Sequence, residues 1–145
     1  MNIDQLKKTA GTMVAPGKGI LAMDESAPTC KKRFDALGIP STPEMRREYR
    51  TMLVTAPNLG EFIGGAILFD ETLRDKTLSG EPFINVLESA GIVPGIKVDA
   101  GIKDMALRPG EKLTEGLDGL GYRLAEYAQL GARFAKWRAV YTVSD

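Results

Sequence analysis

Gly131-Ala-Arg-Phe-Ala-Lys-Trp-Arg-Ala-Val140 is the stretch of sequence from which the fold is predicted. An apolar run with aromatic residues follows a glycine turn, which is typical of a buried strand. Successive side chains of a strand point to opposite faces, so Lys136 shares a face with Phe134 and Arg138. A buried ammonium group without a partner is strongly destabilising, so Lys136 needs a carboxylate, an anion or a water-filled pocket. The alternative is an edge strand whose lysine reaches water.

The composition fits one compact domain and argues against several classes of protein. The chain has 145 residues, of which 19 are basic and 19 acidic, so no net charge directs it to nucleic acid or to a membrane surface. Its single cysteine, Cys30, excludes an internal disulfide framework, and it has no histidine, the most common metal ligand and general base. We recognise no signal peptide and no apolar run long enough to span a bilayer, so we expect a cytoplasmic protein.

Helix and strand patterns alternate along the rest of the chain. Apolar residues at helical spacing predict amphipathic helices over residues 3–14, 28–37, 44–56, 83–90 and 115–130. Short apolar runs predict buried strands within residues 19–26, 64–69, 92–99 and 132–140. Residues 99–115 are expected to form a surface loop. Strands that alternate with helices are typical of an α/β fold with a parallel sheet and crossover helices.

Charged residues stand where each predicted strand ends. They are Asp24 and Glu25, Asp70 and Glu71, Lys97 and Asp99, and Lys136 and Arg138. Parallel α/β folds bind ligands at the carboxyl ends of their strands, and in a barrel these ends form one rim. Taken singly, each residue has a structural interpretation, such as Asp24 capping a helix or Lys97 pairing with Asp99. Asp24, Lys97 and Lys136 together favour a functional site.

Lysines beside a carboxylate in a desolvated pocket suit two functions. They bind phosphorylated anions, and they lower the pKa of a neighbouring lysine so that its free amine can attack a carbonyl. From the residues alone we predict a phosphosugar enzyme on a (β/α) scaffold, with Schiff-base chemistry as one option. Two arginines of the helix after Ser41, Arg47 and Arg50, are interpreted as ordinary solvated charges.

Five motifs occur in the order in which one known family carries them. They are Ala15-Pro-Gly-Lys-Gly-Ile-Leu-Ala-Met-Asp-Glu-Ser26, Gly64-Gly-Ala-Ile-Leu-Phe69, Gly95-Ile-Lys-Val-Asp99, Glu115-Gly-Leu-Asp-Gly-Leu120 and Phe134-Ala-Lys-Trp-Arg138. The whole sequence resembles the class I fructose-bisphosphate aldolases, and Ala27-Pro-Thr-Cys30 and Thr55-Ala-Pro-Asn-Leu-Gly60 are closer to the plant and bacterial branch than to the animal one. The resemblance implies a TIM (β/α)8 barrel. Residues 1–145 are expected to be the N-terminal part of that single domain, a half-barrel of about four β/α units without the C-terminal half.

The resemblance also implies an activity. Class I aldolases reversibly cleave fructose 1,6-bisphosphate to dihydroxyacetone phosphate and glyceraldehyde 3-phosphate in glycolysis and gluconeogenesis, through a lysine Schiff base and without a metal or another cofactor. The Schiff-base lysine and the acid/base glutamate are expected beyond residue 145, so the 145-residue chain alone is expected to be inactive. The alternative is a short half-barrel that binds phosphosugars or assembles with a partner half without catalysis.

Site residues, partners and compartment follow from the same resemblance. Asp24 is expected to handle the substrate hydroxyl at the cleaved bond, and Lys136 to keep the Schiff-base lysine unprotonated, with Lys97 in the same charge cluster. The residues expected to bind substrate or its phosphates are Ser26, Thr29, Lys32, Arg33, Arg46 and Arg138. The full-length protein is expected to be a homo-oligomer that binds neither nucleic acid nor membrane. The expected compartment is the cytoplasm, or a plastid if a transit peptide precedes the chain.

Overall fold

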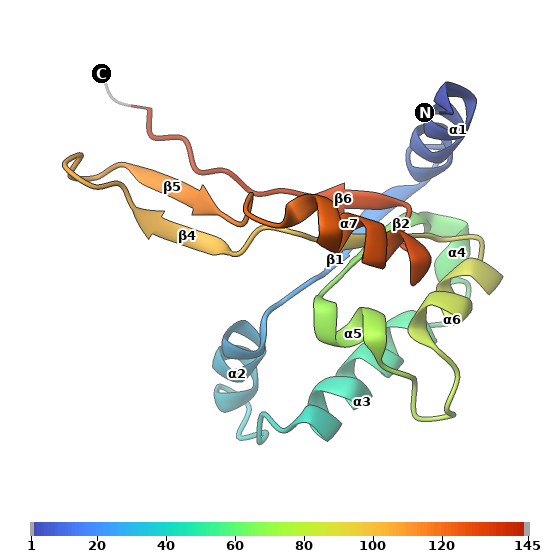
Figure 1. The fold of residues 1–145 in the computed structure, drawn as a ribbon. Coiled ribbons are helices and arrows are strands. Elements are labelled where there is room, and N and C mark those ends of the chain that lie inside the picture. Colours follow the sequence, from blue (N-terminus) through green and yellow to red (C-terminus); the bar gives the residue numbers. More distant parts are fainter. Residues whose placement is uncertain (1, 144–145) are drawn as a thin grey trace.

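A computed structural model describes residues 2–143 of the chain. Across these residues the central feature is a four-stranded sheet in the order β1-β2-β3-β6, in which every neighbouring pair is parallel (Figure 1). The strands are β1 (Gly19–Met23), β2 (Ile63–Leu68), β3 (Val93–Lys97) and β6 (Phe134–Lys136). Sequence order and spatial order agree, as in a barrel wall, so the predicted α/β fold with a parallel sheet is confirmed.

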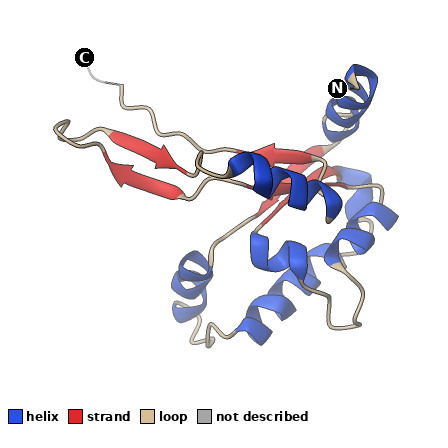
Figure 2. Cartoon of the chain, viewed as in Figure 1, coloured by secondary structure: helices blue, strands red, loops and turns tan. Residues whose placement is uncertain are grey.

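Helix α1 (Ile3–Met13) precedes β1, and the helices after it connect the strands and cover one face of the sheet. They are α2 (Ala27–Asp35), α3 (Pro43–Val54), α4 (Leu59–Phe62), α5 (Asp70–Arg74), α6 (Phe83–Ser89) and α7 (Leu120–Gln129). Local sequence explains where they begin, because the Thr42 side chain accepts a hydrogen bond from the Met45 amide and Pro43 occupies the first turn of α3. Figure 2 shows most of the helices on one side of the strands.

The hydrophobic core lies between the sheet and these helices. Alternation along the strands turns one set of side chains toward the helices: Met23, Ala66, Leu68, Ile96 and Val98, all nearly inaccessible. They pack against apolar side chains of α3, α5, α6 and α7: Val54, Leu73, Phe83, Leu87 and Tyr127. The opposite face carries Ile67, Val93 and the Phe134 ring beside the small residues Gly65 and Gly95, and Lys97 and Lys136 stand at its carboxyl end, where the cleft lies.

A close approach on the open face explains Gly95. The ring of Phe134, on the neighbouring strand, lies over this glycine, and a Cβ at Gly95 would be 2.3 Å from the ring carbon Cζ. Helix α1 lies at the amino ends of the strands, where a Cβ at Gly64 would be 2.5 Å from the carbonyl oxygen of Thr12. The carboxyl ends are left free for the candidate site.

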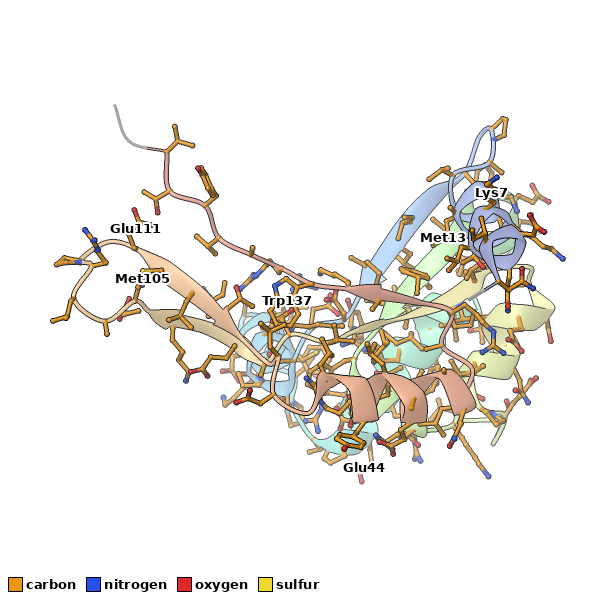
Figure 3. The ribbon with its side chains drawn as sticks, turned by 45° about the horizontal axis from the view of Figure 1, so that its top comes forward. Lys7, Met13, Glu44, Met105, Glu111 and Trp137 are labelled. Atoms are coloured by element: carbon orange, nitrogen blue, oxygen red, sulfur yellow. The ribbon has the colours of Figure 1, made fainter. Side chains whose placement is uncertain are left out.

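The structure corrects three sequence-based boundaries. Residues 99–115, expected to be a loop, form an antiparallel hairpin of β4 (Gly101–Asp104) and β5 (Lys112–Glu115). Figure 3 shows Met105 and Glu111 at its tip, at the opposite end of the molecule from Lys7 of α1.

The other two corrections concern residues that follow glycines. Helix α7 begins at Leu120 rather than near residue 115, because Gly116 and Gly119 adopt left-handed conformations with φ of 118° and 66°. Strand β6 covers Phe134–Lys136 rather than residues 132–140, since its pairing with β3 ends where Lys97 meets Lys136.

Candidate active site

A cleft of about 680 Å³ lies at the carboxyl ends of the parallel strands. Among the described residues, its charged lining consists of three carboxylates and four cations: Asp24, Glu25, Asp99, Arg33, Lys97, Lys136 and Arg138. Figure 3 shows Trp137 at the end of β6, between the sheet and the base of the hairpin. The structure therefore brings together six of the eight charged residues predicted at the strand ends. The other two do not line the cleft, because Asp70 pairs with Arg74 of α5 and Glu71 pairs with Arg46 of α3.

The two outermost strands meet through one ion pair. Nζ of Lys136 donates to Oδ2 of Asp24 at 2.6 Å, although the two residues lie 112 positions apart in sequence. A flat sheet would separate β1 from β6 by three strand spacings, roughly 14 Å, so the contact fits a sheet that curves around this face. The Asp24 side chain is only 10% exposed and that of Lys136 is 32% exposed. Within residues 2–143, β6 is the last strand of the sheet and is only partly buried, so the prediction of a buried strand is wrong and the edge-strand alternative describes it better. Lys136 nevertheless has a carboxylate partner in Asp24.

A second ion pair lies beside the first, because Lys97 of β3 is opposite Lys136 of β6. Nζ of Lys97 donates to Oδ1 of Asp99 at 2.6 Å and to the Asp99 carbonyl at 2.7 Å. The Gly101 amide also donates to Oδ1, at 3.2 Å. Burial opposes ionisation of Asp99, but the hydrogen bond and charge of Lys97 outweigh it and hold the pKa of this carboxyl below its usual range. The structural interpretation of Lys97, a pair with Asp99, is therefore confirmed, and the pair lies in the cleft.

Hydroxyl and guanidinium groups line the mouth of the cleft. Ser26 Oγ and Thr29 Oγ1, from the turn after β1 and the first turn of α2, are 3.1 Å apart. Arg33, later on α2, keeps 56% of its side chain exposed while it pairs with Glu25. Arg138 lines the other side of the cleft, and its carbonyl accepts a hydrogen bond of 2.8 Å from the hydroxyl of Thr114 in the hairpin.

Two of the expected substrate-binding residues do not line this cleft. Lys32 is exposed on α2. Arg46 is bonded to Glu71 through two nitrogens, with Nε to Oε2 at 2.9 Å and Nη2 to Oε1 at 2.6 Å, and also donates to the carbonyl of Ser41 at 3.0 Å. Its guanidinium is therefore occupied by the acid that follows β2.

The interpretation of Arg50 as a solvated helix charge is wrong. This residue is 3% exposed, and its guanidinium bonds the carboxylate and the carbonyl of Glu25. Arg47, interpreted in the same way, is half-buried. The sequence did hold one signal, since Arg46 and Arg50 are four residues apart and so lie on the same face of a helix. It did not show which acids that face would meet.

Hydrogen bonds and charges around Glu25 also set its ionisation. Burial raises the pKa of Glu25, but the hydrogen bond and charge of Arg50, together with the charge of Arg33, lower it below the usual range overall. Burial is the main cause that raises the pKa of the adjacent thiol of Cys30. The rim therefore has an ionised glutamate beside an uncharged, buried thiol.

Comparisons with known proteins find related sequences along the chain. A family model described as glycolytic fructose-bisphosphate aldolase class-I matches residues 5–145. A probable fructose-bisphosphate aldolase class 1 of Xanthomonas campestris pv. campestris is 58% identical over 145 residues, which are 100% of this chain and 43% of that relative. The chloroplastic fructose-bisphosphate aldolase 1 of Chlamydomonas reinhardtii is 55% identical over 140 residues, which are 97% of this chain and 37% of that relative.

A solved structure gives the same result in three dimensions. It is a ternary co-crystal structure of fructose-bisphosphate aldolase from Plasmodium falciparum in complex with TRAP and a small-molecule inhibitor. The TM-score is 0.91 at 51% sequence identity, over 93% of this chain and 39% of that chain. The chain thus spans less than half the length of the relatives it matches.

Proposed function

The chain belongs to the class I fructose-bisphosphate aldolase family, and from this premise we propose that its cleft forms part of an active site that cleaves fructose 1,6-bisphosphate. The products are dihydroxyacetone phosphate and glyceraldehyde 3-phosphate, and the reaction belongs to glycolysis and gluconeogenesis. The observation that carries the proposal is the contact of 2.6 Å between Asp24 and Lys136 at the carboxyl ends of β1 and β6. The bacterial and chloroplast relatives support the plant and bacterial branch.

Aldol cleavage needs a base at the hydroxyl next to the bond that breaks. As the proton leaves that hydroxyl, its electrons form the new carbonyl, and the electrons of the carbon–carbon bond move toward the Schiff-base carbon. Asp24 is an acceptor when ionised, so its carboxylate can take the hydroxyl's hydrogen bond and then its proton. Lys136 fixes the direction of that carboxylate by donating to Oδ2.

The neighbouring lysines also act through their charge. A like charge nearby disfavours protonation of an amine, so Lys97 and Lys136 would lower the pKa of a Schiff-base lysine that approached them. Family resemblance assigns that lysine to a strand beyond residue 145. The resemblance also assigns no metal to the reaction, so activity should persist after dialysis against EDTA.

Phosphate binding would use the donors at the cleft mouth. A phosphate ester carries close to two negative charges and several acceptor oxygens, which suit guanidinium and hydroxyl donors. Arg33 and Arg138 offer guanidinium groups, and Ser26 and Thr29 offer hydroxyls, within the same lining. Lys32 and Arg46 would contribute only if their side chains moved from the positions seen here.

The experiment is an aldol-cleavage assay of the whole protein that the gene encodes. Formation of dihydroxyacetone phosphate is coupled to oxidation of NADH. Borohydride trapping with fructose 1,6-bisphosphate should give a covalent adduct. Calorimetric binding without cleavage or adduct would instead support the non-enzymatic phosphosugar-binding alternative.

A compartment and an assembly state are also proposed. No helix within residues 2–143 is long and apolar enough to cross a bilayer. Relatives include a chloroplast protein, so we propose the cytoplasm with a plastid as the alternative, to be decided by fractionation of the source cells. A homo-oligomer is expected, and light scattering of the purified protein tests it.

A further inference from the structure

Helix α3 holds the turns that follow two neighbouring strands. Arg50 bonds Glu25, after β1, and Arg46, one helical turn earlier, bonds Glu71, after β2. Both arginines are largely buried, with side chains 4% and 14% exposed respectively. Helix α3, which lies outside the cleft, is thus bonded to the turn after β1 and to the turn after β2.

Arg50 makes the more extensive set of contacts. Its Nη1 donates to Oε2 of Glu25, while its Nη2 donates to the carbonyl of Glu25 at 2.8 Å and to Sγ of Cys30 at 3.5 Å. The guanidinium carbon also lies 5.1 Å from the centroid of the Tyr49 ring. One side chain therefore holds the carboxylate and the backbone of Glu25 at the same time, which fixes the turn more firmly than a carboxylate contact alone.

Glu25 connects this anchor to two residues of the cleft. Its neighbour in the chain is Asp24, whose carboxylate bonds Lys136. Its second carboxylate oxygen, Oε1, pairs with Arg33 and lies 3.5 Å from the hydroxyl of Tyr49. A shift of the Glu25 turn would therefore move both the Asp24 carboxylate and the Arg33 guanidinium.

We propose that Arg50 is a positioning residue of the candidate active site, which acts through Glu25 to set the places of Asp24 and Arg33. The proposal rests on the aldolase function proposed above. Arg50 itself does not line the cleft, so it acts without touching substrate. Displacement of a reacting group by 1 Å can cost about 100-fold in rate, so a buried anchor next to Asp24 matters for turnover and not only for stability.

The test uses the gene product in its encoded length with the variants Arg50→Lys, Glu25→Gln and their combination. Lysine keeps the charge of Arg50 but lacks the forked donors that bond carboxylate and carbonyl together. We expect turnover to fall about 10- to 100-fold in each single variant. Because the residues act as a unit, the double variant should lose little more than the worse single variant.

A second readout separates positioning from general damage. Formation of the Schiff base precedes the step assigned to Asp24, so borohydride trapping should stay near the wild-type level while cleavage falls. The control is Arg74→Met, which removes an arginine that bridges Asp70 and Glu126 outside the cleft. It should lower the melting temperature but keep turnover within about twofold of wild type.

Wild-type turnover in Arg50→Lys would overturn the proposal. A loss of trapping and cleavage in parallel, in proportion to the loss of stability, would overturn it as well. If Arg50→Lys fails to fold, Glu25→Gln decides by the same two readouts. If the wild-type protein does not cleave fructose 1,6-bisphosphate, the proposed function fails. The positioning proposal is then decided by calorimetry with inorganic phosphate: altered affinity in Glu25→Gln supports it, and unaltered affinity refutes it.

Discussion

Replacing Lys136 by methionine should impair turnover much more than it impairs substrate binding. Methionine keeps the apolar stem of the side chain within the sheet and removes only the ammonium group. The Asp24 carboxylate, 10% exposed, then loses the donor at 2.6 Å. No other hydrogen-bond partner of that carboxylate is found within residues 2–143, so its direction is no longer fixed.

The expected loss of stability follows from how deeply each side chain of the ion pair is buried. Breaking a fully buried ion pair by removing one partner costs about 3–5 kcal/mol. Water reaches the Lys136 end, which is 32% exposed, so we expect a loss of about 1–2 kcal/mol in the free energy of unfolding. A misdirected acid/base group costs more in catalysis, and turnover should fall by about 100-fold or more.

The assay measures kcat and KM for fructose 1,6-bisphosphate in the gene product of encoded length, with urea unfolding in parallel. Lys112→Met is the matched control, because Lys112 pairs with an exposed carboxylate, that of Asp104 in the hairpin, outside the cleft. It should leave kcat, KM and stability close to wild type. An unchanged kcat in Lys136→Met would refute the role of Lys136 and show that the ion pair only stabilises the fold.

Three further predictions follow. Gly95→Ala should lower the free energy of unfolding in urea by about 1–3 kcal/mol, because the new Cβ would displace the Phe134 ring. The control Gly121→Ala, which has open space in α7, should raise it by about 0.5–1 kcal/mol. Equal effects of the two variants would contradict the contact between Gly95 and Phe134. The pKa of Asp99 lies below its ordinary 3.8, so its ionised form stabilises the fold above that value, and the stabilisation is lost as pH falls through the folded pKa. The difference in unfolding free energy between wild type and Asp99→Asn should therefore shrink between about pH 5 and pH 3, and a constant difference would show that the ion pair with Lys97 contributes nothing. Residues 1–145 expressed alone should associate, because β1 and β6 each pair on one side within residues 2–143, and light scattering showing a folded monomer would contradict this.

The main architecture could be predicted because its signals are local. Buried parallel strands leave short continuous apolar runs, and amphipathic helices leave apolar residues at helical spacing. The hairpin at residues 101–115 could not be predicted in this way. Its strands have four residues each, too few to show alternation. Their charged residues, such as Lys112 and Asp104, which form an exposed ion pair, are equally typical of a surface loop.

The centre of the candidate site was equally accessible to sequence reasoning. A period of two places Lys136 on the face of Phe134, and in a barrel the carboxyl ends of the strands form one rim, so Asp24, Lys97 and Lys136 were predicted to approach one another. Arg50 could not be placed by the same logic. An arginine among charged helix neighbours has the same pattern whether it faces water or a buried glutamate, and only the packing of α3 decides between them.

The acids after β1 show how that packing makes two adjacent carboxylates chemically different. Asp24 and Glu25 carry the same charge and differ by one methylene group. The carboxylate of Glu25 is bonded by Arg50 on one oxygen and by Arg33 on the other, and these cations hold its pKa low, so it is a poor proton acceptor. Asp24 has one donor, Lys136, on Oδ2, which leaves lone pairs in the cleft for a hydroxyl. Under the proposed function, Asp24 is therefore the carboxylate of this turn that would act on substrate, and Arg50, outside the cleft, would contribute by pairing with Glu25.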